Sequence, residues 1–372
     1  MKVLHTSDLH FGHMFDGIDR SDEFEMFARW LDEMLTRTKI DILLISGDIY
    51  DHYHPSQEAL RLYHTYLPLF ARKVGKVVIV GGNHDSPRTL QITKGLLEER
   101  NIEIVTGSDE DYCRAIEHGG VGIFACSYLR NHILERIDPD FRKAYGRIYG
   151  EGLKNLGGDI KIAMGHVSLL NAQRAGSERE IYIGKIEGVG ADTFEGFDYT
   201  ALGHFHKSQS VGNVHYSGSP LAMNFKEDYP KYLHLLTIEN EVELQKVEVP
   251  AFREFVSIKG SLEEIEECLK ELDDHGNELK SFVQIELTTA LQSPSLGRWK
   301  KEYKNLHILR IKTPAPKKGR TIAIGMDRAL SPMEVAKRVL EDEGMEAKEK
   351  EALLAALEEI VGLEEGDENT QA

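Results

Sequence analysis

The chain lacks the features of a membrane or secreted protein. Its 372 residues contain no apolar run near 18 residues, the length that crosses a bilayer. The N-terminus leads directly into a strand-like segment, without the basic and apolar regions of a signal peptide. Cysteine is scarce, with only Cys113, Cys126 and Cys268, which excludes a disulfide framework or a C-x-x-C zinc site. We therefore expect a cytoplasmic protein with no membrane partner.

Two further absences concern nucleotides and positive charge. No G-x-x-x-x-G-K-[ST] loop is present, so this chain itself is not expected to bind ATP. The formal net charge is −17, which at first argues against nucleic acid. The charge is segregated, however. Residues 331–372 hold 4 basic and 13 acidic residues, whereas residues 297–320 hold 9 basic residues and 1 acidic residue. This basic stretch either contacts a phosphate backbone or is a solvated charged face.

Polar side chains follow five apolar, strand-like segments at the point where each segment ends. The segments are 2–6, 40–46, 76–80, 160–165 and 199–203, and the residues that follow them are Asp8, His10, Asp48, Asn83, His84, His166, His204 and His206. Amphipathic helices are predicted at 23–38 and 56–73, between the first three strands. Alternating strands and helices predict an α/β fold, in which the carboxyl edge of the sheet carries the site.

Carboxylate, amide and imidazole groups, without thiolates, are the ligands of a divalent metal. They suit Mn²⁺, Fe²⁺ or Zn²⁺ and include more nitrogen than Mg²⁺ or Ca²⁺ usually takes. Seven ligands are too many for one ion with an open position, so we expect two ions that activate a shared hydroxide. His84 lies beside the ligand Asn83 and is the candidate general acid, with Asp85 predicted to hold its other ring nitrogen.

These residues, in this order, resemble the calcineurin-like metallophosphoesterase family. The family pattern is matched by Asp8-Leu-His10, Gly47-Asp48, Gly82-Asn-His-Asp85, Gly165-His166 and Gly203-His-Phe-His206. The resemblance implies a four-layer β-sandwich flanked by helices. It also implies one metal held by Asp8, His10, Asp48 and His206. The other metal is then held by Asp48 as the bridge, with Asn83, His166 and His204, and His84 is a catalytic residue that is not a ligand.

Within the family, further segments are similar to the SbcD group of bacterial nuclease subunits. They are Leu4–His10, Glu180–Gly184, Ala201–His206 and Tyr216–Pro220. This similarity implies a dimeric, Mn²⁺-dependent DNA exonuclease and endonuclease, with Mg²⁺, Fe²⁺ or Zn²⁺ as alternative metals. It implies work with an SbcC-type coiled-coil ATPase in DNA repair, recombination and replication. Some relatives have a histidine at the place of Asp51; here His52 and His54 are nearby, and whether either contacts substrate stays open.

The organisation expected along the chain follows from these features. A nuclease domain covers 1–250, a small α+β domain that caps the DNA covers 251–316, and a linker covers 317–330. Residues 331–363 form a Leu-striped helical segment that either docks on the ATPase or folds back on its own domain, and 364–372 are a disordered tail. The basic residues expected to contact DNA are Arg298, Lys300, Lys301, Lys304, Lys317, Lys318 and Arg320.

The same metal centre would also serve a small-substrate metallophosphoesterase that acts on phosphomonoesters or cyclic nucleotides. The cap-like domain, the basic stretch and the docking-like tail favour the nuclease. A non-catalytic scaffold that keeps the fold would have no use for the full ligand set and His84.

Overall fold

The computed structural model describes residues 1–92, 94–95, 101–170, 172–173, 188–274, 278–288 and 295–312. The chain divides into two units after Pro314, and every described residue belongs to the first. The expected linker, docking segment and tail therefore lie outside the described residues, as do Lys317, Lys318 and Arg320. In the described part of the chain, no helix is long and apolar enough to cross a membrane.

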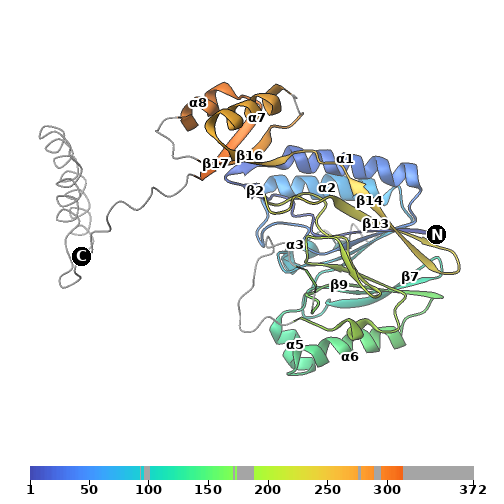
Figure 1. Ribbon diagram of the computed structural model, residues 1–372. Helices are drawn as coiled ribbons and strands as arrows, with labels where there is room; N and C mark the ends of the chain where they lie inside the picture. Colours follow the sequence, from blue (N-terminus) through green and yellow to red (C-terminus); the bar gives the residue numbers. More distant parts are fainter. Residues whose placement is uncertain are drawn as a thin grey trace, which may run out of the picture. The chain divides into compact units, whose positions relative to one another are not determined.

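Two six-stranded sheets form the body of this unit (Figure 1). The first has the order β14 (Val242–Val249), β13 (Lys231–Ile238), β1 (Lys2–Thr6), β4 (Ile42–Ser46), β5 (Lys76–Val80) and β6 (Ile102–Val105). β1, β4, β5 and β6 run parallel, whereas β13 pairs antiparallel with β1. The first strand is thus internal in its sheet, between β13 and β4, so the residues that follow it can lie close to those that follow β4.

The second sheet has the order β11 (Gln209–Val211), β12 (Val214–Tyr216), β10 (Tyr199–Gly203), β9 (Ile160–His166), β8 (Val121–Cys126) and β7 (Cys113–His118). β8, β9, β10 and β12 are parallel. The strands predicted at 160–165 and 199–203 are therefore neighbours, and the carboxyl ends of β9 and β10 lie at one edge.

Helices cover the outer face of each sheet, which gives the four layers that the family resemblance implied (Figure 1). α1 (Ser21–Thr38), α2 (Gln57–Ala71) and α3 (Pro87–Gln91) belong to the first half; α5 (Asn131–Ile137), α6 (Phe141–Lys154) and the short η1 (Ala191–Phe194) belong to the second. α3 begins at Pro87, directly after the N-cap Ser86, whose hydroxyl accepts from Thr89 N–H at 3.3 Å. Residues 96–100 lie outside the described residues.

Three apolar cores separate the layers and explain why the central strands are apolar on both faces. In β1, Val3 belongs to the core between the two sheets, while Leu4 belongs to the core beneath α1 and α2. β4 alternates in the same way, with Leu44 in the first of these cores and Leu43 in the second. The third core lies between the second sheet and α6. A strand buried on both sides reads as a continuous apolar run.

A smaller unit follows the sandwich, made of β15 (Phe255–Gly260), α7 (Leu262–Asp274), β16 (Ser281–Leu287), α8 (Ser295–Glu302) and β17 (Leu306–Lys312). All its strand pairs are parallel, so each helix is a crossover. A capping box opens α7, because Ser261 N–H donates to Glu264 Oε2 at 2.7 Å and Glu264 N–H donates to Ser261 Oγ at 3.4 Å. α8 was not predicted from the sequence.

This capping unit packs on a hairpin made of β2 (Met14–Phe15) and β3 (Ile18–Asp19), which follows the metal-site turn after β1. The ring of Phe15 lies 5.1 Å from that of Phe255 and 5.2 Å from that of Phe282. Arg310 donates twice to the carboxylate of Asp16, at 2.7 and 3.1 Å. The capping unit therefore contacts the β2–β3 hairpin, which follows His10 directly in the chain.

Candidate metal centre

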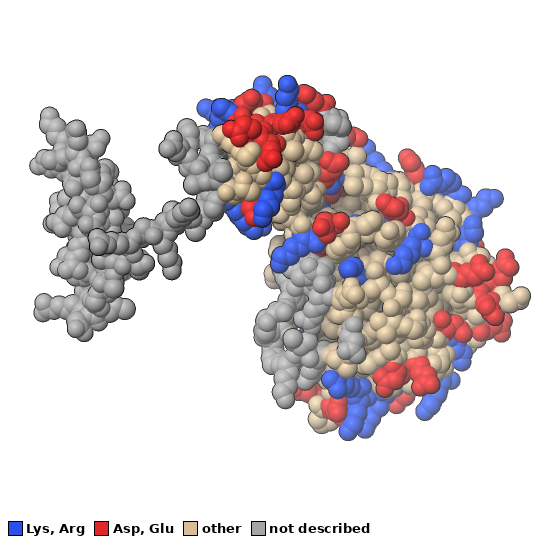
Figure 2. All heavy atoms as spheres, in the orientation of Figure 1, with Lys and Arg blue, Asp and Glu red and all other residues tan. Residues whose placement is uncertain are grey.

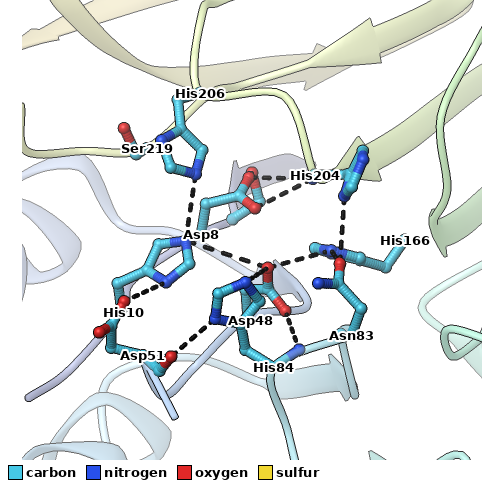
Figure 3. Close-up of polar contacts among 12 residues, drawn as sticks. Asp8, His10, Asp48, Asp51, Asn83, His84, His166, His204, His206 and Ser219 are labelled. Atoms are coloured by element: carbon cyan, nitrogen blue, oxygen red, sulfur yellow. Dashed lines mark hydrogen bonds and ion pairs between the residues drawn. The ribbon is translucent and has the colours of Figure 1, made fainter. Parts of the chain in front are cut away.

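The carboxyl ends of the ligand-bearing strands from both sheets meet at one point (Figure 3). Two glycines make the approach feasible. A Cβ on Gly203 would lie 1.9 Å from the Ser46 carbonyl oxygen, and a Cβ on Gly47 would lie 2.3 Å from His166 Nδ1. Any side chain at these positions would push the strand ends apart. The Gly-Asp and Gly-His pairs of the sequence thus serve a steric purpose.

The turns after β1 and β4 hold three site residues in the left-handed backbone region. Asp8, His10 and Asp48 have φ values of 52°, 47° and 48°. Side-chain-bearing residues rarely adopt this conformation, and it persists only where the surroundings impose it. Here the two turns are bonded to each other, since Asp8 N–H donates to Gly47 O and His10 N–H to Asp48 O, both at 3.0 Å. The strain aims these side chains toward the common point.

One cluster of donor atoms joins Asp8, His10 and His206. The Nε2 atoms of His10 and His206 lie 3.1 Å apart. Asp8 is fixed by the Ser7 hydroxyl, which donates to its Oδ2 at 2.5 Å, and by His204 N–H, which donates to its Oδ1 at 3.0 Å. All three cluster residues are buried.

A second cluster surrounds Asn83. Its Oδ1 lies 2.9 Å from His166 Nε2 and 3.1 Å from His204 Nδ1. Asp48 lies between the two clusters, with its Oδ2 3.3 Å from His166 Nε2 and 3.9 Å from His10 Nε2. All seven residues predicted as ligands are therefore brought together.

Hydrogen bonds on the outer side of two imidazoles fix which nitrogen faces the site. His166 Nδ1 contacts the Ser46 carbonyl oxygen at 2.9 Å, and a carbonyl only accepts, so Nδ1 carries the proton. His206 Nδ1 contacts Glu227 Oε1 at 3.1 Å, and the ionised carboxylate likewise accepts. In both residues the Nε2 lone pair is left for the site, as metal-binding histidines require.

Burial and mutual charge set the titration of the centre. Burial raises the pKa of Asp48, but the charges of His166 and His84 outweigh it and hold this pKa well below its usual range. Burial lowers the pKa of His166, yet Asp48 more than compensates and raises it to about 9. Burial lowers the pKa of His204 to about 3. Without a metal ion, the centre therefore pairs the Asp48 carboxylate with a protonated His166, beside a neutral His204.

These donors fit divalent ions. Two imidazole lone pairs that face each other at 3.1 Å, as in His10 and His206, repel unless a proton or a cation lies between them. The carboxylates, amide oxygen and imidazoles are hard and borderline donors, with no thiolate among the described residues of the centre.

The two predicted catalytic residues have different surroundings. His84 is close to the centre, with its Nε2 3.9 Å from Asp48 Oδ2. The expectation that Asp85 holds its other nitrogen is wrong, because His84 Nδ1 donates to the backbone carbonyl of Asp51 at 2.7 Å. Asp85 instead accepts from the N–H groups of Gly82, Ile49 and Tyr50 at 2.8–3.1 Å. Asp85 therefore shapes the turn after β4 instead of holding His84.

Sequence reasoning missed two carboxylates that contact site histidines. Asp51 Oδ1 lies 3.3 Å from His10 Nδ1, while its Oδ2 lies 3.2 Å from the exposed His52. Glu227 contacts His206 from a loop. The sequence drew attention to the place of Asp51 only for the histidine that some relatives have there, and Glu227 follows no strand-end motif, so only the fold reveals these two contacts.

Comparison with known proteins agrees with this geometry. The calcineurin-like phosphoesterase family matches residues 1–208, and the type 5 capsule protein repressor C-terminal domain matches residues 251–344. The SbcD component of the SbcCD nuclease of Escherichia coli K12 is 31% identical over 319 residues, which cover 78% of each chain. Its counterpart in Staphylococcus epidermidis is 28% identical, covering 71% of this chain and 74% of its own, and that in Bacillus subtilis is 27% identical, covering 78% and 80%.

The four-layer fold, the clustered donors and these similarities agree. The chain belongs to the calcineurin-like phosphoesterase family, within its SbcD nuclease group, and is a hydrolase of the metal-dependent nuclease kind.

Proposed function

We propose that this protein cleaves DNA phosphodiester bonds with two divalent metal ions, as exonuclease and endonuclease, in DNA end processing. The observation that carries the proposal is the position of Asp48, whose Oδ2 lies 3.9 Å from His10 Nε2 in the first cluster and 3.3 Å from His166 Nε2 in the second. A carboxylate shared in this way can bridge two ions. Two ions held in this way would stabilise both the attacking and the leaving oxygen of one phosphate.

Asp8, His10 and His206 would hold one ion and Asn83, His166 and His204 the other, with Asp48 shared. When bound, such ions polarise a phosphate oxygen and lower the pKa of water, so that a nucleophile is available near neutral pH. The protein holds the ligands rigidly. The left-handed turns and the hydrogen bonds to Nδ1 of His166 and His206 support this role. Mn²⁺ is the metal we favour, because four imidazoles suit it better than Mg²⁺.

His84 would serve the leaving group. The Asp51 carbonyl accepts from Nδ1–H, so a proton for the departing oxygen must come from Nε2, which faces the centre. The bond to a backbone carbonyl also fixes the direction of the ring. His84 is thus suited to deliver a proton or to place positive charge beside the phosphate.

The capping unit would help to hold DNA. Arg298, Lys300, Lys301 and Lys304 are exposed in and just after α8. Trp299 of α8 and Tyr303, which follows the helix, are buried in the core of this unit. Arg298 is paired with Glu266, and Figure 2 shows basic and acidic side chains intermixed over this unit. Lys300, Lys301 and Lys304 are therefore the better candidates for phosphate contacts.

Two interactions extend the proposal beyond the described residues. The names of the relatives, which place them in an SbcCD nuclease, support an SbcC-type ATPase as partner, with residues 331–363 as its docking segment. We also propose that the protein is a homodimer. Removal of residues 331–372 should leave cleavage of single-stranded DNA intact and abolish binding to the ATPase; unchanged binding would reject the docking role.

The decisive assay compares end-labelled linear DNA and circular single-stranded DNA with a phosphomonoester, each with Mn²⁺. Shortening of the linear DNA and nicking of the circle are the expected results. Hydrolysis of the phosphomonoester alone would overturn the proposal in favour of a small-substrate phosphoesterase.

A further inference from the structure

Glu227 and Lys231 form a buried ion pair behind His206, on the side of the imidazole that faces away from the other ligands. Glu227 Oε1 lies 3.1 Å from His206 Nδ1, and Glu227 Oε2 is paired with Lys231 Nζ. The two side chains are 0% and 9% exposed. A charged pair is costly to bury, so it is retained only with good geometry or a purpose.

The pair is held from several sides. Glu227 Oε2 also accepts from Met223 N–H at 3.2 Å, and Lys231 Nζ donates to Ser219 Oγ at 3.0 Å. The ammonium lies 4.6 Å from the centre of the Tyr229 ring, within cation–π range. Lys231 is the first residue of β13, the neighbour of β1, so the pair is anchored to the sheet that carries Asp8.

The pair is not simply part of a tightly packed core. Glu227 and Lys231 line a cavity of about 420 Å³, together with Glu248–Val256, the segment that leads into the capping unit. Because this open space adjoins the pair, hydrogen bonds must do more than packing from that side to hold Glu227 and Lys231 in place behind His206. This distinguishes His206 from His166, whose Nδ1 is held by the main chain of β4.

We propose that Glu227 and Lys231 are positioning residues for metal binding, with Glu227 fixing the tautomer and direction of His206 and Lys231 holding Glu227 in place. A carboxylate behind a ligand histidine makes the facing nitrogen a better donor, and loss of such a partner typically weakens metal affinity. Lys231 cancels the charge of Glu227, so the pair orients the ligand without adding net charge. The inference rests on the proposed role of His206 as a ligand.

The charge balance makes the prediction specific. If Glu227 becomes glutamine, the amide oxygen can still accept from His206 Nδ1–H, but the Lys231 ammonium loses the negative charge of Glu227. An ammonium cation that Glu227 no longer balances would then sit behind a ligand and oppose binding of a metal ion. Replacing Lys231 as well removes that cation and leaves the hydrogen bond to His206.

The test is titration of the metal-free protein with Mn²⁺, following free Mn²⁺ by electron paramagnetic resonance. Glu227→Gln should weaken one of the two binding steps, by roughly 10- to 100-fold, and leave the other unchanged. The double variant with Glu227→Gln and Lys231→Met should recover part of that loss. Circular dichroism and the melting temperature of the metal-free protein report whether each variant folds, and the double variant carries the test if the single one does not.

A matched control is Glu286→Gln in the exposed Lys259–Glu286 pair of the capping unit, where the side chains are 66% and 49% exposed. It should leave both binding steps unchanged. His206→Ala tests the ligand role of His206 separately from the positioning role of Glu227. If His206→Ala loses a binding step and Glu227→Gln does not, the positioning role is refuted. If His206→Ala keeps both steps, the ligand assignment of the proposed function fails. A double variant no better than Glu227→Gln refutes the role of Lys231.

Discussion

His10 Nε2 and His206 Nε2 lie 3.1 Å apart, although 196 residues separate them in the sequence. One follows β1 and the other follows β10, in the opposite sheet. The pair exists only when both sheets have formed and docked. A cation that binds both imidazoles therefore binds the folded state and not the unfolded chain.

Metal binding should accordingly stabilise the fold. An ion at a concentration 100 times its Kd adds about 2.7 kcal/mol per site to the free energy of unfolding. We expect the melting temperature to rise with Mn²⁺ and to fall after chelation, as measured by calorimetry. A melting temperature independent of Mn²⁺ would contradict binding across the two sheets.

Asp48→Ala should remove both ions together, because its carboxylate lies 3.9 Å from His10 Nε2 in the first cluster and 3.3 Å from His166 Nε2 in the second. Mn²⁺ titration should show neither binding step at concentrations that saturate the wild type, and the Mn²⁺-dependent rise in melting temperature should vanish. Asn83→Ala is the matched variant, since Asn83 contacts His166 and His204 only and should weaken one step. Retention of one full-affinity ion in Asp48→Ala would show that Asp48 is not the bridge.

His84→Gln should separate metal binding from chemistry. The glutamine amide can still donate to the Asp51 carbonyl, which His84 Nδ1 contacts at 2.7 Å, so the turn should be preserved. It cannot deliver a proton, and loss of a general acid typically lowers kcat by about 10²- to 10⁴-fold. The measurement is kcat on a small phosphodiester beside Mn²⁺ stoichiometry. Unchanged turnover with two bound ions would remove His84 from catalysis.

The joint between the cap and the nuclease should depend on aromatic packing more than on charge. Phe15 is 6% exposed and contacts Phe255 and Phe282, and replacing a buried phenylalanine by alanine costs about 3–5 kcal/mol. Arg310, half exposed, pairs with Asp16, and exposed ion pairs contribute less than about 1 kcal/mol. In denaturant unfolding, Phe15→Ala should therefore be far more destabilising than Arg310→Ala. Equal losses of unfolding free energy in the two variants would mean that the Arg310–Asp16 pair contributes as much to this contact as the aromatic packing.

Much of the site could be predicted from the sequence because its ligands are local to strand ends. Each apolar strand and the polar turn after it lie within about ten residues, so the motif and its context are read together. The convergence of the five ends then follows from parallel strand order. Glu227 could not be predicted, because its contact with His206 depends on how a loop returns to β13.

The missed helices have a different cause. α6 contains Gly146, Gly150 and Gly152, which disfavour a helix, yet packing overrides this preference. A Cβ on Gly152 would lie 2.5 Å from the Phe124 ring, so the glycine allows α6 to approach β8 closely. α8 is mostly polar and basic, so its sequence shows no clear apolar stripe. Trp299 is its buried apolar residue among those described. Local sequence preference therefore fails to predict these two helices, because tertiary packing stabilises them.

A buried histidine network between the sheets should make the fold sensitive to acid. The Tyr199 hydroxyl lies 3.0 Å from His5 Nδ1 and 3.0 Å from His234 Nδ1, and the His215 ring stacks on Tyr199 at 4.4 Å. Burial lowers the pKa of His234 to about 3 and that of His215 to about 4, and it lowers the pKa of His5 well below its usual value.

The sign follows from proton binding. The folded state keeps these histidines neutral, whereas the unfolded chain takes up protons below pH 6.5, so stability falls as the pH drops from 6.5 toward 4. Each such histidine contributes a slope of up to about 1.4 kcal/mol per pH unit. His234→Gln should reduce the slope of unfolding free energy against pH by about that amount, measured by denaturant unfolding of the metal-free protein. His54→Gln, at an exposed histidine outside the network, should leave the slope unchanged. Equal slopes in His234→Gln and the wild type would mean that His234 is protonated in the folded protein.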